Sequence, residues 1–169
     1  MAPTTLLEAK LMASGDERAA ALDLDGSGIT VGIIAARWNH DIVSRLVDGA
    51  QRGLLDLGVT KLVNKTVPGA FELPLAAKVL AESGTVDAIV VVGAVIRGET
   101  THYELVAGEC ARGTMDVQLN TRVPIGMGVL TVENIAQAEA RSQGPGGHNV
   151  GEEAAQAAAE LAILWRNCD

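Results

Sequence analysis

Short apolar runs alternate with longer segments of helical periodicity along most of this chain. The apolar runs are rich in valine, isoleucine and alanine and end in glycine, proline or polar residues, a pattern typical of strands buried in a sheet. The runs predict four strands, at residues 29–36, 62–67, 88–96 and 124–131. The segments between and after them predict helices at 40–57, 71–81, 102–119, 134–141 and 152–166.

This alternation predicts an α/β fold, because strands separated by helices pair in parallel and carry helices on both faces of the sheet. We expect a three-layer α/β/α sandwich with a four-stranded parallel sheet in flavodoxin-like order. Residues 29–169 are expected to form a single domain, preceded by an N-terminal arm at residues 1–28. At the first helix, Asn39 is expected to cap the N-terminus with its side chain, and Gly58 to end the helix.

Composition and charge restrict the possible functions. The net charge of -8 argues against a nucleic-acid partner, which requires a basic surface, and no apolar run is long enough for a transmembrane helix. The N-terminal residues lack the pattern of a secretory signal. The two cysteines, Cys110 and Cys168, are far apart and favour free thiols in a reducing compartment, so we expect a cytoplasmic protein.

Polar residues follow the predicted strands where these end, and the carboxyl ends of parallel strands share one edge of a sheet. Trp38 offers a plane for stacking, and Glu72 is an acceptor for ligand hydroxyl groups. Residues 98–101 open a helix, where backbone N–H groups favour an anion. His102 can exchange a proton near neutral pH. Together these residues favour a site for a phosphorylated substrate and a proton-transfer step.

Each of these residues also has an ordinary structural explanation. Trp38 alone suits a half-buried loop, Glu72 a helix N-terminus where carboxylates are stabilising, and His102 a helix start without chemistry. Other site types are disfavoured, because the sequence has no Gly-x-Gly-x-x-Gly, Walker or Gly-x-Ser-x-Gly motif. The three histidines, His40, His102 and His148, lack the spacing of a metal site, so no metal is expected.

Four motifs, in this order along the chain, resemble the 6,7-dimethyl-8-ribityllumazine synthase family. They are ARWN at 36–39, VPGAFELP at 67–74, GAVIRGETTHY at 93–103 and VPIGMGVLT at 123–131. The resemblance extends over residues 29–165. It implies a transferase of riboflavin biosynthesis that acts at the penultimate step, without a metal or organic cofactor. The implied reaction condenses 5-amino-6-(D-ribitylamino)uracil with 3,4-dihydroxy-2-butanone 4-phosphate to 6,7-dimethyl-8-ribityllumazine, releasing phosphate and water.

The resemblance also implies which residues form the site. His102 is the implied catalytic residue, as a proton shuttle. The implied substrate-binding residues are Trp38, stacking on the pyrimidine; Ala70, Phe71 and Glu72, on the ribityl chain; Ala94, Val95 and Ile96, at the pyrimidine edge; Glu99 and Thr100, on the phosphorylated substrate; Met127, lining the pocket; and Arg141, on the phosphate.

The chain departs from the family pattern after Arg141. Ser142 and Gln143 follow where the family has Ala-Gly, and the loop before the last helix lacks the lysine of many bacterial members. This loop resembles the fungal branch, so His148 either supplements Arg141 or is an exposed loop histidine. The resemblance further implies a homopentamer with its sites between subunits. The lengthened loop at residues 141–151, which contains Pro145, favours free pentamers over a shell of twelve pentamers.

Three other functions remain open at this point: a non-catalytic flavin or lumazine binder, an assembly protein, and a flavodoxin-like FMN carrier. His102 and Arg141 favour the enzyme over a binder, since a binder needs no proton shuttle. The pairing of Trp38 with Glu72 disfavours a protein that only assembles. The FMN carrier is disfavoured because residues 37–39 replace its hydroxyl-rich phosphate loop. The alanine-rich terminal helix packs either on its own sheet or against another subunit.

Overall fold

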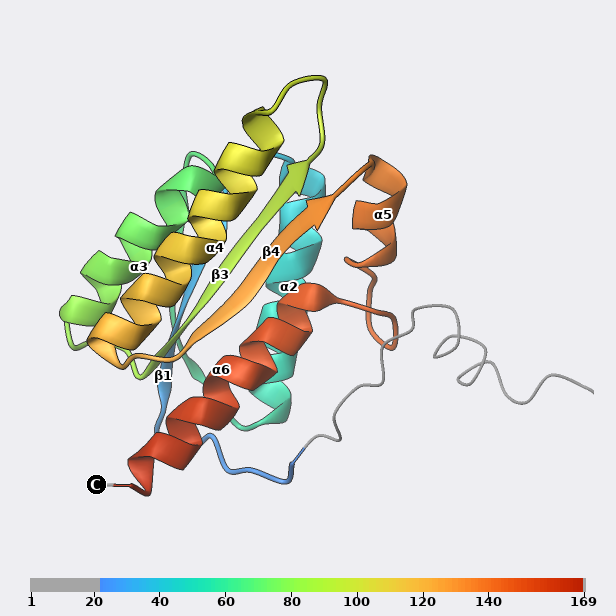
Figure 1. Ribbon diagram of the computed structural model, residues 1–169. Coiled ribbons are helices and arrows are strands. Elements are labelled where there is room, and N and C mark those ends of the chain that lie inside the picture. The colour runs from blue at the N-terminus through green and yellow to red at the C-terminus, as the bar shows by residue number, and fades with distance from the viewer. Residues whose placement is uncertain (1–21, 169) are drawn as a thin grey trace, which may run out of the picture.

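The computed structural model describes residues 22–168 (Figure 1). Along this part of the chain, strands and helices alternate as the hydrophobic pattern predicts. The elements are β1 Thr30–Ala36, α2 His40–Asp56, β2 Lys61–Val67, η1 Ala70–Glu72, α3 Leu73–Glu82, β3 Ala88–Ile96, α4 His102–Thr121, β4 Ile125–Val132, α5 Ile135–Ala140 and α6 Val150–Arg166.

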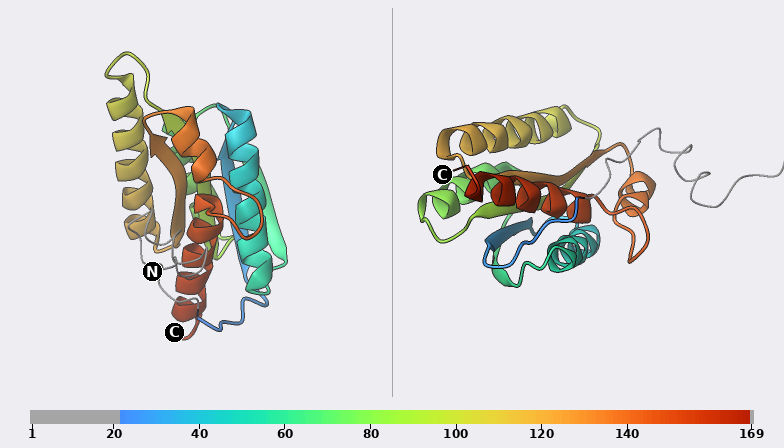
Figure 2. Two further views of the ribbon diagram at one scale, coloured as in Figure 1. Left: turned by 90° about the vertical axis from the view of Figure 1, so that its right-hand side faces the viewer. Right: turned by 90° about the horizontal axis from the view of Figure 1, so that it is seen from below.

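The four strands form one parallel sheet in the order β2-β1-β3-β4. Helices α3 and α4 cover one face, and α2 and α6 cover the other (Figure 2). This arrangement confirms the predicted three-layer sandwich and its flavodoxin-like strand order. Strand β2 is an outer strand with mostly exposed side chains, whereas β3 is buried from Ala88 to Ala94.

Two aliphatic cores lie on the two faces of the sheet. Along β1, Val31 and Ile33 face the core under α2 and α6, whereas Ile34 faces the core under α3 and α4. This division follows from the alternation of side chains along a strand. Buried side chains of this size each contribute about 1.5–3 kcal/mol relative to exposure, so both cores stabilise the sheet without large aromatic residues.

Residues 22–28, the described end of the predicted arm, lie against the domain. The backbone N–H of Gly26 donates to the carbonyl of Leu57 at 2.7 Å. The Arg166 guanidinium donates to the carbonyls of Ser27 and Asp25 at 2.9 and 3.0 Å. The remainder of the predicted arm, residues 1–21, lies outside the described residues.

Two helix starts differ from the predictions for identifiable reasons. A 3-10 turn at Ala70–Glu72 precedes α3, which begins at Leu73 with Pro74 in its first turn, where the missing N–H of proline costs nothing. Helix α6 begins at Val150 rather than Glu152. Its N-cap is Asn149, whose side chain accepts a hydrogen bond from the Glu152 N–H at 3.1 Å.

Helix α6 packs so closely on α2 and β4 that only glycine fits at the points of contact. A Cβ atom on Gly151 would lie 2.0 Å from the carbonyl oxygen of Leu46 in α2. A Cβ on Gly126 of β4 would lie 2.0 Å from the carbonyl oxygen of Ala154 in α6. The alanines on the inner side of α6 are buried within this chain. The helix therefore packs on its own sheet, as one of the two alternatives predicted.

The variant Gly151→Ala tests this contact. We expect it to lower the free energy of unfolding by about 1–3 kcal/mol, because the backbones must separate to admit the methyl group. Chemical denaturation at a fixed protein concentration measures the change. The control is Gly108→Ala in α4, where a Cβ would meet nothing within 4 Å of the described chain. Equal stability of Gly151→Ala and the parent protein would contradict the prediction.

Candidate active site

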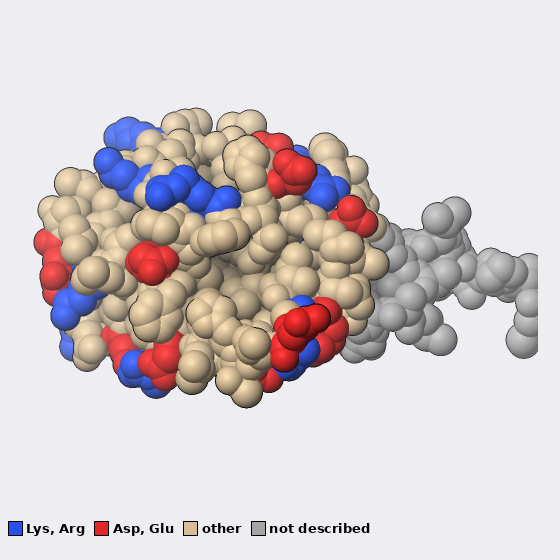
Figure 3. All heavy atoms as spheres, turned by 90° about the horizontal axis from the view of Figure 1, so that it is seen from above, with Lys and Arg blue, Asp and Glu red and all other residues tan. Residues whose placement is uncertain are grey.

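A pocket of about 700 Å³ opens at the carboxyl ends of the strands. Figure 3 shows this face, with a hollow near its centre and charged side chains mostly around the rim. The walls come from the β1–α2 turn, η1, the end of β3 and the start of α4. The lining residues are Trp38, Asn39, Gly69, Ala70, Phe71, Glu72, Ala94, Val95, Ile96, Gly98, Thr100, His102, Tyr103, Leu105 and Val106.

Nine of the twelve predicted site residues line this pocket. They come from segments that are far apart in the sequence, which the parallel sheet brings to one edge. Glu99 does not line the pocket, although it lies between Gly98 and Thr100 in the same loop, and its side chain is exposed. Met127 and Arg141 do not line the pocket of their own chain either.

Trp38 and Glu72 lie next to each other across Gly69. A Cβ atom on Gly69 would stand 3.2 Å from Cδ1 of Trp38 and 3.2 Å from Oε2 of Glu72. The glycine therefore leaves room for the indole ring and the carboxylate to lie side by side at the pocket wall. Trp38 is 72% exposed, so one face of its ring is available to a planar ligand.

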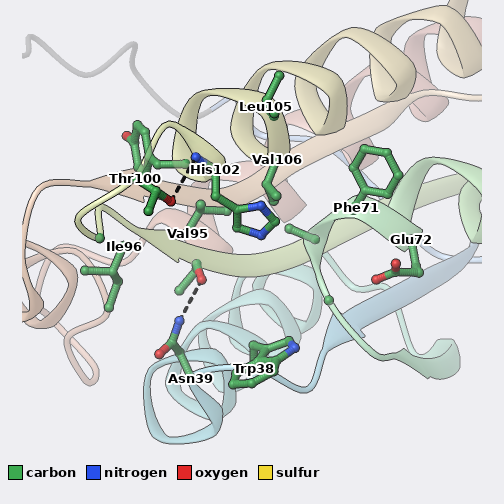
Figure 4. Close-up of a pocket in the computed structure, with 15 residues that line it drawn as sticks. Trp38, Asn39, Phe71, Glu72, Val95, Ile96, Thr100, His102, Leu105 and Val106 are labelled. Atoms are coloured by element: carbon green, nitrogen blue, oxygen red, sulfur yellow. Dashed lines mark hydrogen bonds between the residues drawn. The ribbon is translucent and has the colours of Figure 1, made fainter.

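Asn39 adopts a conformation that the sequence pattern did not predict. Its φ of 56° lies in the left-handed region, and its side chain does not cap α2. Instead, Nδ2 donates a hydrogen bond to the carbonyl oxygen of Ala94 at 2.8 Å (Figure 4). Asn39 therefore stands at the predicted N-cap position, but the expected capping by its side chain is wrong. The side chain ties the turn that carries Trp38 to the end of β3, and so joins two walls of the pocket.

His102 is the first residue of α4, and its imidazole points into the pocket across from Trp38 (Figure 4). Its backbone N–H donates to Oγ1 of Thr100 at 3.3 Å, which closes the turn before the helix. The dipole of this helix start favours an anion at the same side of the pocket. A proton-exchanging ring and an anion-favouring helix end thus lie close together.

Arg97 connects the start of α4 to two neighbouring segments. Its guanidinium forms ion pairs with Glu104 in the first turn of α4 and, at 2.7 Å, with Glu133 after β4. It also lies over the ring of Tyr103, 4.2 Å from the ring centroid. The hydrogen bond from Arg97 lowers the pKa of Glu104 below its ordinary value, and the two carboxylates raise the pKa of Arg97. Both partners therefore stay charged at neutral pH.

The comparisons with known proteins give one consistent result. Residues 28–166 match the family model for 6,7-dimethyl-8-ribityllumazine synthase. The chain belongs to this family. A protein of that name from Kineococcus radiotolerans is 45% identical over 146 residues, which cover 86% of this chain and 90% of the relative. A second, from Cutibacterium acnes, is 46% identical over 136 residues, covering 80% of this chain and 81% of the relative.

Membership of the lumazine synthase family confirms the resemblance drawn from the four motifs. It also confirms that the chain is an enzyme, a transferase of riboflavin biosynthesis. The non-catalytic binder, the assembly protein and the FMN carrier are correspondingly disfavoured. Within residues 22–168, no group of three or more His, Cys, Asp or Glu side chains is placed to hold a metal ion, and no helix combines the length and hydropathy of a membrane span.

Two of the family's expected site residues lie toward the outer strand β4. Met127 is the third residue of β4, paired with Val91, several residues before the carboxyl end of the strand. Arg141 follows α5, with an exposed side chain whose Nη1 donates to the carbonyl of Gln137 at 3.1 Å.

Sequence reasoning missed some pocket residues of this lumazine synthase family member. Leu105 and Val106 line the pocket because they follow His102 by three and four positions on one helix face. The spacing of three and four residues from His102 could have identified both as pocket residues from the sequence. The role of Asn39 had no such signal, since its partner, Ala94, lies 55 residues away in the sequence.

Substitutions at Asn39 separate its backbone conformation from its hydrogen bond. Both Asn39→Gly and Asn39→Ala lose the bond to Ala94, but alanine also pays about 1–2 kcal/mol for the left-handed conformation. We expect Asn39→Ala to be less stable than Asn39→Gly by about that amount. Denaturation followed by Trp38 fluorescence in a Trp165→Phe background measures this. Equal stability of the two variants would show that the backbone strain is absent.

Proposed function

We propose that this pocket condenses 5-amino-6-(D-ribitylamino)uracil with 3,4-dihydroxy-2-butanone 4-phosphate to form 6,7-dimethyl-8-ribityllumazine. The supporting observation is that nine residues expected from the family motifs meet in one pocket at the carboxyl ends of the strands. The steps are imine formation, loss of phosphate, ring closure and loss of water. Each consists of bond exchanges and proton transfers between the two substrates.

The pocket suits catalysis by positioning. Trp38 presents a stacking surface to the pyrimidine, and Glu72 beside it accepts hydrogen bonds from ribityl hydroxyl groups. The backbone of Ala94–Ile96 meets the pyrimidine edge, while Thr100 and the start of α4 face the phosphorylated substrate. Holding both substrates in reactive geometry is worth up to about 7–11 kcal/mol in favourable systems. Proton transfer by His102 adds a further factor of about 10²–10⁴.

We further infer that the active form is a homopentamer in which each pocket is completed by a neighbouring subunit. In the single chain the pocket walls are open, with Phe71 59% and Leu105 63% exposed. Leu75, Val79 and Leu119 add exposed apolar surface on α3 and α4, which is suited to subunit contact. In this arrangement, the pocket of one subunit receives Met127 and Arg141 from its neighbour, and Arg141 binds the phosphate.

We also propose that the enzyme acts in the cytoplasm as free pentamers. The support for the compartment is that both cysteines, Cys110 and Cys168, are free thiols. The support for free pentamers is the lengthened loop before α6, which contains Pro145.

The decisive experiment follows the formation of lumazine by absorbance and fluorescence after mixing the two substrates, against the spontaneous rate. We expect a clear acceleration by the parent protein. We expect His102→Ala to slow turnover by about 10²–10⁴-fold while leaving a measurable rate, because positioning remains. Light scattering controls for assembly. Absence of acceleration by a correctly assembled protein would overturn the proposed reaction.

A mixing experiment tests whether subunits share their sites. Arg141→Ala should raise the KM for the butanone phosphate, and His102→Ala should lower kcat. When the two variants are co-expressed in equal amounts, about a quarter of the interfaces combine an intact Arg141 with an intact His102 from the adjacent subunit. Recovery of activity above that of either variant is therefore expected. No recovery in mixed pentamers would place both residues in one subunit's site.

A further inference from the structure

Asn149 is a buried polar residue that does not line the pocket, and every group of its side-chain amide has a partner. It is 1% exposed. Its Oδ1 accepts from the Glu152 N–H at 3.1 Å and so caps α6. Its Nδ2 donates to the carbonyl oxygen of Arg45 in α2 and to that of Gln143, each at 2.9 Å. One side chain therefore connects α6, α2 and the loop that precedes α6.

A glycine in the middle of α2 provides the space for this side chain. A Cβ atom on Gly49 would lie 2.1 Å from Oδ1 of Asn149. Any larger residue at position 49 would push the amide away from the carbonyl of Arg45. The amide and the glycine are thus matched across the α2–α6 contact.

The same amide fixes the base of the loop at residues 142–149. Ser142 and Asn149 form an antiparallel bridge, and the Gln143 N–H donates to the carbonyl of His148 at 2.9 Å. Immediately outside this bridge, the Val150 N–H donates to the carbonyl of Arg141 at 3.0 Å. The backbone of Arg141 is therefore held to a closed loop base that Asn149 anchors on α2.

We propose that Asn149 is a positioning residue for Arg141. The inference rests on the proposed function, in which Arg141 binds the phosphate of the substrate. Asn149 makes no contact with the pocket; it fixes where the backbone of Arg141 lies relative to the sheet. Because the backbone of Arg141 is fixed, its exposed guanidinium loses less conformational entropy when it binds the phosphate. Displacement of a positioned group by an ångström can cost up to about 10²-fold in rate.

Two variants disturb the hydrogen bonds of Asn149, one at Asn149 itself and one at its neighbour in α2. Asn149→Ser keeps a side-chain oxygen that can cap α6 but removes the two amide donors. Gly49→Ala keeps the asparagine side chain but pushes it away from α2 by a steric clash. The matched control is Gly53→Ala, one turn further along α2, where a Cβ would meet the carbonyl oxygen of Glu152 at 2.9 Å. It strains the same helix contact without touching Asn149.

We expect Asn149→Ser and Gly49→Ala to raise the KM for the butanone phosphate by roughly tenfold, with a much smaller change in the KM for the pyrimidine. Gly53→Ala should leave the ratio of the two KM values unchanged, even where it lowers the melting temperature. Light scattering confirms equal assembly. A parallel rise in both KM values in Asn149→Ser and Gly49→Ala would indicate general destabilisation and would overturn the proposal.

A double-mutant cycle shows whether Asn149 acts through Arg141. In an Arg141→Ala background, Asn149→Ser should have no further effect on the KM for the butanone phosphate. Fully additive effects would overturn the positioning role while leaving the phosphate role of Arg141 intact. An unchanged KM in Arg141→Ala alone would instead remove the phosphate role itself, and the proposal with it. The two failures are therefore distinguishable.

Discussion

Helix α6 touches α2 and β4 backbone to backbone, through Gly151 against Leu46 and Gly126 against Ala154. Side chains of normal size would hold these elements apart, so the contact fixes their separation and leaves little freedom for sliding. The buried alanines that follow Gly151 along α6 extend this close approach over most of the helix. As a result, the start of α6, and with it the loop that ends in Asn149, has one defined position over the sheet.

The candidate active site lies at the edge of the sheet that the carboxyl ends of the parallel strands share. Three strand ends and one helix start contribute Trp38, Glu72, the end of β3 and His102 to a pocket that no single segment could form. The rigid sheet sets the spacing between these groups, and short ties such as the Asn39–Ala94 hydrogen bond and the Arg97 ion pairs adjust the loops. The scaffold sets the inner walls of the pocket, whereas its outer wall is exposed in the single chain, at Phe71 and Leu105.

The sequence alone predicted most of the fold, and nine of the twelve residues expected in the site line one pocket. Apolar runs located β3 at residues 88–96, because a strand buried on both faces has a strong and local signal. The resemblance to a family supplied residue roles that periodicity cannot give. The contacts that could not be predicted join segments that are remote in the sequence. The side chain of Asn39 bonds to the carbonyl of Ala94 instead of capping α2, and that of Asn149 donates to the carbonyl of Arg45, 104 residues earlier. The starting points of α3 and α6 differ for a local reason, since proline and asparagine each set a helix start within a residue or two.

The hydrogen bonds from Arg166 to the carbonyls of Asp25 and Ser27 join the last helix to the segment that precedes β1. The entry into β1 and the exit from α6 meet at the end of the sheet opposite the pocket (Figure 1). The two ends of the described domain therefore lie close enough to be joined without a change in the fold. A peptide linker between these two ends, with new termini at a surface turn elsewhere, would give a circularly permuted chain with the same sheet and the same pocket.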